Sequence, residues 1–195
     1  MLEKALIYSP LSVEPAMHYF ALTIIGRDRP GIVADVTEVL YRLGCNIADS
    51  SCTLLGGQFA MILIVSSPDI DGKQPFLDAF AGIEESGLSV FVRVLKPGGE
   101  LRADMRGEIC MISVYGSDKP GIVYRVTQEL ARRQINITDL NTKLVGSEER
   151  PVYVMMLEAM LPEGQDEDSL KAIMAGLKDE LQVDINVRSI TPVEL

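Results

Sequence analysis

The sequence is poor in the side chains that most catalytic and metal sites need. Among 195 residues it has one histidine, three cysteines and no tryptophan. A Ser-His-Asp or Cys-His arrangement could use only His18, which stands just before an apolar run and is better explained as a histidine at a strand edge. The spacing of Cys45, Cys52 and Cys110 fits neither a zinc site nor a disulfide framework. We therefore expect no metal, no cofactor, no enzyme activity and a reducing, cytoplasmic environment.

Other absences narrow the function further. The chain has no Walker-type phosphate loop and no GxGxxG motif, no run of about 18 apolar residues that could span a membrane, and no start typical of a secretory signal. Acidic side chains outnumber basic ones by 28 to 18, and the formal charge of −10 disfavours direct binding to a phosphate backbone. This charge still permits a protein that acts on DNA through a basic partner.

An internal repeat organises the chain. The segment Gly26-Arg-Asp-Arg-Pro-Gly-Ile-Val33 returns as Gly116-Ser-Asp-Lys-Pro-Gly-Ile-Val123, an offset of 90 residues (116 − 26). Further matches follow at the same offset: Asn46-Ile47 with Asn136-Ile137, Asp49 with Asp139, and Thr37 with Thr127. A shared register of this length predicts two copies of one domain.

Each copy has the pattern of a βαββαβ unit. In the first copy, strands are predicted at 19–25, 46–55, 59–65 and 88–95, with helices through 32–43 and 75–85. In the second copy, strands are predicted near 108–115, 135–146, 150–160 and 183–190, with helices near 121–133 and 167–181.

This element order predicts an α+β fold of two ferredoxin-like domains, each an antiparallel sheet with helices on one face. Residues 19–25 are continuously apolar, aromatic or β-branched, which is typical of a strand buried on both faces or nearly so. The expected organisation is a leader (1–16), a first domain (17–96), a linker (97–107) and a second domain (108–195).

The turn between the first strand and the first helix of each copy carries the main functional signal. Asp28 is expected to cap the first helix, and Pro30 to occupy its first turn. A helix N-terminus favours an anion, and Gly31 and Gly121 remove the side chain that would keep a ligand from the first amides.

An asparagine in each copy adds to this signal. Asn46 and Asn136 are expected to open the next strand beside the loop, with a side chain that both donates and accepts hydrogen bonds. A free α-amino acid needs that combination, and Asp28 or Asp118 could hold its ammonium group. The same residues would also serve a helix start with no ligand, so binding and purely structural roles both stay open.

The Asp-Arg-Pro-Gly-Ile-Val loop, the helix after it and Gly44-Cys-Asn-Ile47 resemble the ACT domain, a small-molecule-sensing regulatory module. From His18 to Phe59 the chain more specifically resembles the family of the glycine cleavage system transcriptional repressor, a tandem of two ACT domains. The resemblance covers nearly the whole chain from residue 17. It implies a non-enzymatic regulator that senses a small amino acid, with glycine expected, and that binds a LysR-type transcription activator rather than DNA. Because ACT domains pair edge to edge into a continuous sheet, it also implies pairing within the chain and then a homodimer.

The resemblance also implies which residues bind the ligand, often across a domain interface. The matching positions are Asp28, Arg29, Gly31, Ile32, Asn46 and Ile47 in the first copy, and Asp118, Lys119, Gly121, Ile122, Asn136 and Ile137 in the second. Serine-sensing ACT domains often have a histidine and an asparagine where this chain has Gly26 and Asp28, which puts serine in doubt.

Two further functions stay open. One is a ligand-independent protein-interaction module that regulates a metabolic enzyme. The other is an acylphosphatase-like activity on the same fold, which the acidic Asp28 disfavours beside an anionic substrate.

Overall fold

The computed structural model describes residues 17–96, 107–147 and 149–190. The chain divides into two compact units, Met1–Ala103 and Asp104–Leu195, and each has its own hydrophobic core. The expected leader and all but the last residue of the expected linker lie outside the described residues, so those boundaries stay predictions.

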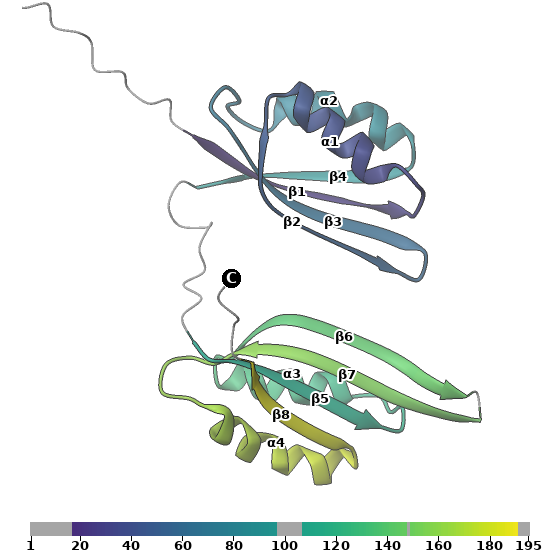
Figure 1. The fold of residues 1–195 in the computed structure, drawn as a ribbon, viewed down its shortest axis with the longest axis vertical. Coiled ribbons are helices and arrows are strands. Elements are labelled where there is room, and N and C mark those ends of the chain that lie inside the picture. The colour runs from purple at the N-terminus through teal and green to yellow at the C-terminus, as the bar shows by residue number, and fades with distance from the viewer. Residues whose placement is uncertain (1–16, 97–106, 148, 191–195) are drawn as a thin grey trace, which may run out of the picture. The chain divides into compact units, whose positions relative to one another are not determined.

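The first unit follows the predicted order of strands and helices (Figure 1). Its elements are β1 (His18–Arg27), α1 (Ile32–Arg42), β2 (Asn46–Leu55), β3 (Gln58–Ser67), α2 (Gln74–Glu85) and β4 (Leu88–Leu95). The four strands form one antiparallel sheet in the order β2-β3-β1-β4, so β2 and β4 are its edges.

The second unit repeats this topology. Its elements are β5 (Ile109–Gly116), α3 (Ile122–Arg132), β6 (Asn136–Ser147), β7 (Arg150–Met160), α4 (Glu167–Leu181) and β8 (Asp184–Ile190). The sheet order is β6-β7-β5-β8, again antiparallel throughout. The predicted α+β fold of two ferredoxin-like domains is confirmed.

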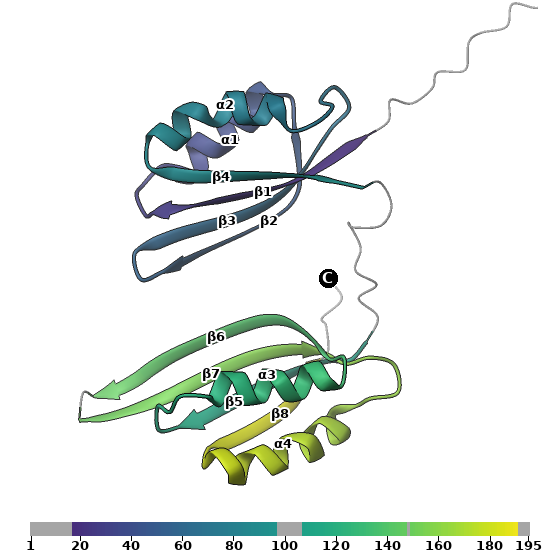
Figure 2. The ribbon, with the colours of Figure 1, turned by 180° about the vertical axis from the view of Figure 1, so that it is seen from behind.

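In each unit both helices cover the same face of the sheet, and the other face is open (Figures 1 and 2). Phe20, Leu22 and Ile24 of β1 are fully buried on the helix side, whereas the next residue, Ile25, is 43% exposed. The expectation that residues 19–25 are buried on both faces or nearly so is therefore wrong, because no described residue of the unit covers the second face. Among the described residues of the unit, the apolar side chains of this face have no layer packed over them.

The first helix of each unit begins differently from the prediction. The N-cap residues are Gly31 and Gly121, with left-handed φ values of 92° and 99°, and neither helix has a side-chain cap. Asp28 therefore does not cap α1, and Pro30 precedes the helix instead of lying in its first turn. Glycine adopts a left-handed backbone conformation at little cost, whereas other residues are strained in it, which explains the glycine at both positions.

Helix α4 has the side-chain cap that the other helices lack. The Asp166 carboxylate accepts a hydrogen bond from the Ser169 backbone N–H at 2.9 Å, and the Ser169 hydroxyl accepts one from the Asp166 N–H. The bond from the Ser169 backbone lowers the pKa of the Asp166 carboxyl below its ordinary value.

We predict a pH-dependent stability difference between Asp166→Ala and the native chain. A carboxyl with a lowered pKa stabilises the fold above its ordinary pKa, and this contribution is lost as the pH falls through the lowered value. Thermal unfolding should show the variant melting lower at pH 7, with the gap closing toward acid. Asp166→Asn, which keeps the hydrogen-bond acceptor and loses the charge, should melt between the native chain and Asp166→Ala at pH 7. A gap for Asp166→Ala that stays constant down to acid pH would contradict the role of the charge.

Candidate functional site

The loop between β1 and α1 is held against the neighbouring hairpin. The Asp28 backbone N–H donates to the Gly57 carbonyl at 3.0 Å, which fixes the loop beside the turn between β2 and β3. The Asp28 side chain is exposed, as is that of Asp118 in the second unit. Both carboxylates are therefore available to a ligand cation at the ends of β1 and β5.

Arg29 makes contacts inside its own unit. Its Nη2 lies 2.7 Å from Asp35 Oδ2 on α1 and 3.4 Å from Ser86 Oγ at the end of α2. The guanidinium thus ties the loop to both helices. Its proposed role as a ligand residue stays a prediction, and these contacts give it a structural role as well.

The second unit makes the corresponding tie with different residues. Lys119, at the position of Arg29, donates from Nζ to Gln182 Oε1 at 3.0 Å. Arg125, at the position of Asp35, donates from Nε and Nη2 to both carboxylate oxygens of Glu180 at 2.8 and 2.7 Å. Both units therefore use polar side chains near this helix start to link it to the end of their second helix.

The isoleucines that follow the glycines lie in the core. Ile32 and Ile122 are 2% exposed, so toward a ligand they can present only backbone N–H groups. Ile47 is partly exposed in the edge strand β2, and Ile137 packs partly buried against the second core.

The asparagines lie away from the loops of their own units. Asn46 is opposite Ser66, at the end of the sheet where β1 begins, whereas Asp28 contacts Gly57 at the end where β1 finishes. About nine residues along β3 separate these two points, which corresponds to roughly 30 Å. The expectation that Asn46 stands beside the loop is wrong within one unit, and Asn136, opposite Met160, repeats this placement.

A register shift next to each asparagine was not predicted. In β2 the pairing shifts between Ile47 and Asp49, and in β6 it shifts between Ile137 and Asp139. Such bulges bend a strand and redirect side chains near its end. No glycine marks either bulge, and the repeated spacing Asn-Ile-x-Asp was the only sequence signal for it.

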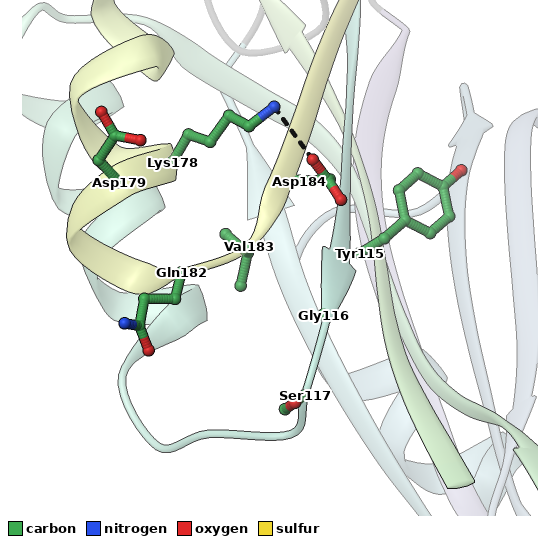
Figure 3. A pocket seen from close by; sticks show the side chains of 8 residues that line it. All are labelled: Tyr115, Gly116, Ser117, Lys178, Asp179, Gln182, Val183 and Asp184. Carbon is green, nitrogen blue, oxygen red and sulfur yellow. Dashed lines mark ion pairs between the residues drawn. The ribbon is translucent and has the colours of Figure 1, made fainter.

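In the second unit, an open hollow of about 430 Å³ lies next to the start of the loop between β5 and α3 (Figure 3). It is lined by the end of β5, the end of α4 and the start of β8, and the Lys178–Asp184 ion pair, with Nζ and Oδ1 3.0 Å apart, crosses it. Of the loop between β5 and α3, only Ser117 lines it, and the predicted ligand residues do not. This hollow therefore does not bring those residues together.

The described residues offer little for catalysis. None of their His, Cys, Asp and Glu side chains form a group of three or more that could hold a metal ion. Burial, followed by nearby carboxylates such as Glu108, raises the pKa of the Cys110 thiol to about 11, and burial also raises the pKa of Cys45. Neither of these thiols is poised as a nucleophile at neutral pH. No helix in the described part of the chain is long and apolar enough to span a membrane.

Comparison with known families explains the repeat. A model of the ACT domain matches residues 18–90 and, a second time, residues 108–188. The chain belongs to the ACT domain family. Each structural unit thus corresponds to one ACT domain, and the chain is a tandem of two.

Relatives of two lengths share this domain. The chain is 26% identical over 176 residues to the glycine cleavage system transcriptional repressor of Escherichia coli K12, a match that covers 88% of this chain and 91% of that protein. A UPF0237 protein of Methanopyrus kandleri is 43% identical over 75 residues, which cover 37% of this chain and 82% of that protein. The first relative matches both ACT domains, and the second is about one ACT domain long.

The fold also has a solved counterpart. The crystal structure of an unknown protein from Galdieria sulphuraria superposes with a TM-score of 0.77 and 24% identity, covering 90% of this chain and 100% of that one. At this identity the likeness shows a shared fold.

Proposed function

We propose that the chain is a non-enzymatic regulator that binds a small amino acid, with glycine the expected ligand, and modulates a transcription factor without binding DNA itself. The observation that carries the proposal is the duplicated helix start. Gly31 and Gly121 both leave the first turn of a helix without a side-chain cap, so backbone N–H groups can receive a carboxylate. The similarity to a transcriptional repressor over 88% of the chain supports the regulatory part.

The proposed binding site needs a second ACT domain, and we propose that a second molecule of the chain supplies it. Within one ACT domain, Asn46 is too far from the Asp28–Gly31 loop to touch the same small ligand. If the edge strand β2 pairs antiparallel with β2 of a second molecule, the start of one strand lies beside the end of the other. Asn46 of one molecule then lies next to Leu55 and the loop of its partner, and β6 allows the same arrangement for Asn136.

The edge strand β2 suits this pairing. Every residue of β2 is exposed, including Leu54 at 60% and Leu55 at 75%, and the strand contains neither lysine nor proline. A long edge without such protection is a template for another strand. We therefore propose a homodimer with amino-acid sites at the paired edges.

Ligand-induced stabilisation tests the proposal. The full chain, titrated with glycine, alanine and serine, should show a rise in Tm with at least glycine. Because hydrogen bonds to charged groups contribute about 1.5–3 kcal/mol, Asn46→Ala and Asn136→Ala together should weaken binding roughly tenfold to a hundredfold.

Asn186→Ala is the matched control, since Asn186 is an exposed asparagine on the opposite edge strand β8. It should leave the ligand response unchanged. Absence of stabilisation by any of the three amino acids, or an equal response in all variants, would contradict sensing at these positions.

The partner is proposed to be a protein rather than nucleic acid. A formal charge of −10 opposes contact with a phosphate backbone, and a LysR-type activator is the candidate partner. The chain alone should give no shift of promoter DNA in a gel, whereas it should change the shift given by the activator. A shift by the chain alone at physiological salt would overturn this part.

A ligand-independent interaction module is the second candidate. Arg29 and Lys119, the cations of the two loops, already have partners in their own domains, which fits loops that serve structure alone. Such a module would hold its partner, for example a metabolic enzyme, equally well with and without amino acids.

A further inference from the structure

The open face of the first sheet is apolar over its centre. Directly paired residues of neighbouring strands share a face, so the register defines rows across this surface, three of which cross its centre. From β2 to β4 the rows are Thr53–Ala60–Ile25–Ser89, Ser51–Ile62–Thr23–Phe91 and Asp49–Ile64–Ala21–Arg93. Ile62 is 53% exposed and Phe91 62% exposed, although both stand on a sheet whose other face is covered by helices.

The fold itself does not require this composition. The corresponding rows of the second sheet carry charges at several central and edge positions. The rows are Lys143–Val154–Tyr115–Asp184 and Asp139–Glu158–Met111–Arg188. Asp139 and Arg188 stand at the positions of Asp49 and Arg93, whereas Lys143, Glu158 and Asp184 replace the uncharged Thr53, Ile64 and Ser89. The second domain thus shows that the same topology tolerates a charged open face, whereas the first domain keeps an apolar one.

We infer that the open face of the first sheet binds the same face of a second molecule, about a two-fold axis parallel to the strands and midway between β1 and β3. Such an axis places β2 over β4 and β3 over β1 of the other molecule. A surface that meets itself in this way must be complementary to itself.

The rows meet that condition. Under this axis the large Phe91 faces Ser51, Ile62 faces Thr23, and Ile64 faces Ala21, so a large side chain meets a small one at each position. In the remaining row Ile25 faces Ala60. Interdigitation of large and small side chains is how two sheets pack about 10 Å apart.

The charges follow the same symmetry. Asp49 and Arg93 are the charged residues of the three rows, and they stand at opposite ends of one row. The proposed axis therefore brings Asp49 of each molecule over Arg93 of the other. An axis perpendicular to the strands would instead stack Phe91 on Phe91 and Ile62 on Ile62, leaving the opposite charges apart.

The area is sufficient for a specific interface. The whole face, four strands of eight to ten residues, presents roughly 19 by 33 Å, or roughly 600 Å² of each molecule, which is near the lower end of stable protein interfaces. The three complementary rows occupy about the central half of that area. This face is distinct from the strand edges invoked for amino-acid binding, so the inference stands independently of that function.

Sedimentation equilibrium of the full chain tests the inference. The native chain should have an assembly mass of an even number of chains, and Ile62→Glu and Phe91→Glu should each halve that mass, because a carboxylate would be buried without a partner. Tyr41→Glu, at an 84% exposed aromatic position on α1, is the matched control and should keep the native mass. Far-UV circular dichroism checks that the variants are folded.

A monomeric native chain, or a native mass in both face variants, would overturn the inference and would mean that a different occupant covers the face. Failure of amino-acid binding would leave these masses unchanged, which separates the two proposals. Charge reversal tests the axis: Asp49→Arg and Arg93→Asp should each weaken association, and the double reversal should restore it. Weakening that the double reversal does not restore would overturn the orientation.

Discussion

Leu22→Ala is expected to lower the free energy of unfolding of the first ACT domain by about 2–5 kcal/mol while leaving the second domain unchanged. Leu22 is fully buried in the centre of β1, and its truncation removes core contacts and leaves a cavity. The cores are separate: the buried residues of one cluster belong to residues 20–90, and those of the other to residues 110–187. A cavity in one core therefore has no reason to weaken the other.

The second domain provides the matched variant. Ile112 stands 90 residues after Leu22, is also fully buried, and occupies the same position in β5. Ile112→Ala should destabilise the second domain by a similar amount and spare the first. The two changes together should add, because they share no partner.

Hydrogen–deuterium exchange read peptide by peptide can measure the two domains separately. Leu22→Ala should lower the protection of the slowest peptides within 17–96 by roughly 30-fold to several thousand-fold, with peptides of 107–190 unaffected. Equal loss of protection in both ranges would show that the chain unfolds as one unit and would contradict independent domains.

Much of the fold could be predicted because its signals are local. The bounds predicted for β2, β4, β7 and α4 coincide with those of the structure. Glycines and prolines lie at or near the ends of many of the segments, and the hydrophobic period distinguishes strands from helices. The repeat then supplied each assignment twice, so a weak signal in one domain was supported by the other.

The start of α1 could not be predicted from residue types alone. Asp-x-Pro-Gly is compatible with a capping aspartate and with the arrangement found, in which Gly31 is the N-cap. The choice depends on the backbone: Asp28 is held to the β2–β3 turn by its own N–H, which keeps its side chain from the first amides of the helix.

The position of Asn46 was predictable from connectivity and was missed. An 11-residue helix is about 16 Å long and runs back along the sheet, so the strand after it must begin near the start of β1. Asn46 is close to the loop in sequence and remote from it in one domain. A ligand that contacts both must therefore lie between two ACT domains, which is why the proposed site is placed at a paired strand edge.

Glycine-to-alanine changes should lower the free energy of unfolding at one kind of position in this chain and raise it at another. A Cβ at Gly26 would lie 2.7 Å from Leu88 Cδ2 and 2.8 Å from the Gly87 carbonyl oxygen, and one at Gly116 would lie 2.7 Å from Val183 Cγ1. Because backbone cannot move aside as easily as a side chain, Gly26→Ala should cost about 1–3 kcal/mol of stability. Gly116→Ala, which meets mainly a side chain, should cost less.

The control glycines lie in helices of the same two domains. At Gly82 in α2 and Gly176 in α4 an added Cβ would have no neighbouring atom within 4 Å, and neither residue has a left-handed φ, so alanine there should stabilise by about 0.4–1 kcal/mol. Urea unfolding of the four variants measures the difference, and a stabilising Gly26→Ala would contradict the close approach of β4. The same close contact bears on the difference at position 26, where serine-sensing ACT domains often have a histidine and this chain has a glycine. A histidine there would require the start of β4 to shift. The first domain therefore leaves no room for a side chain at its loop entry without a shift of β4.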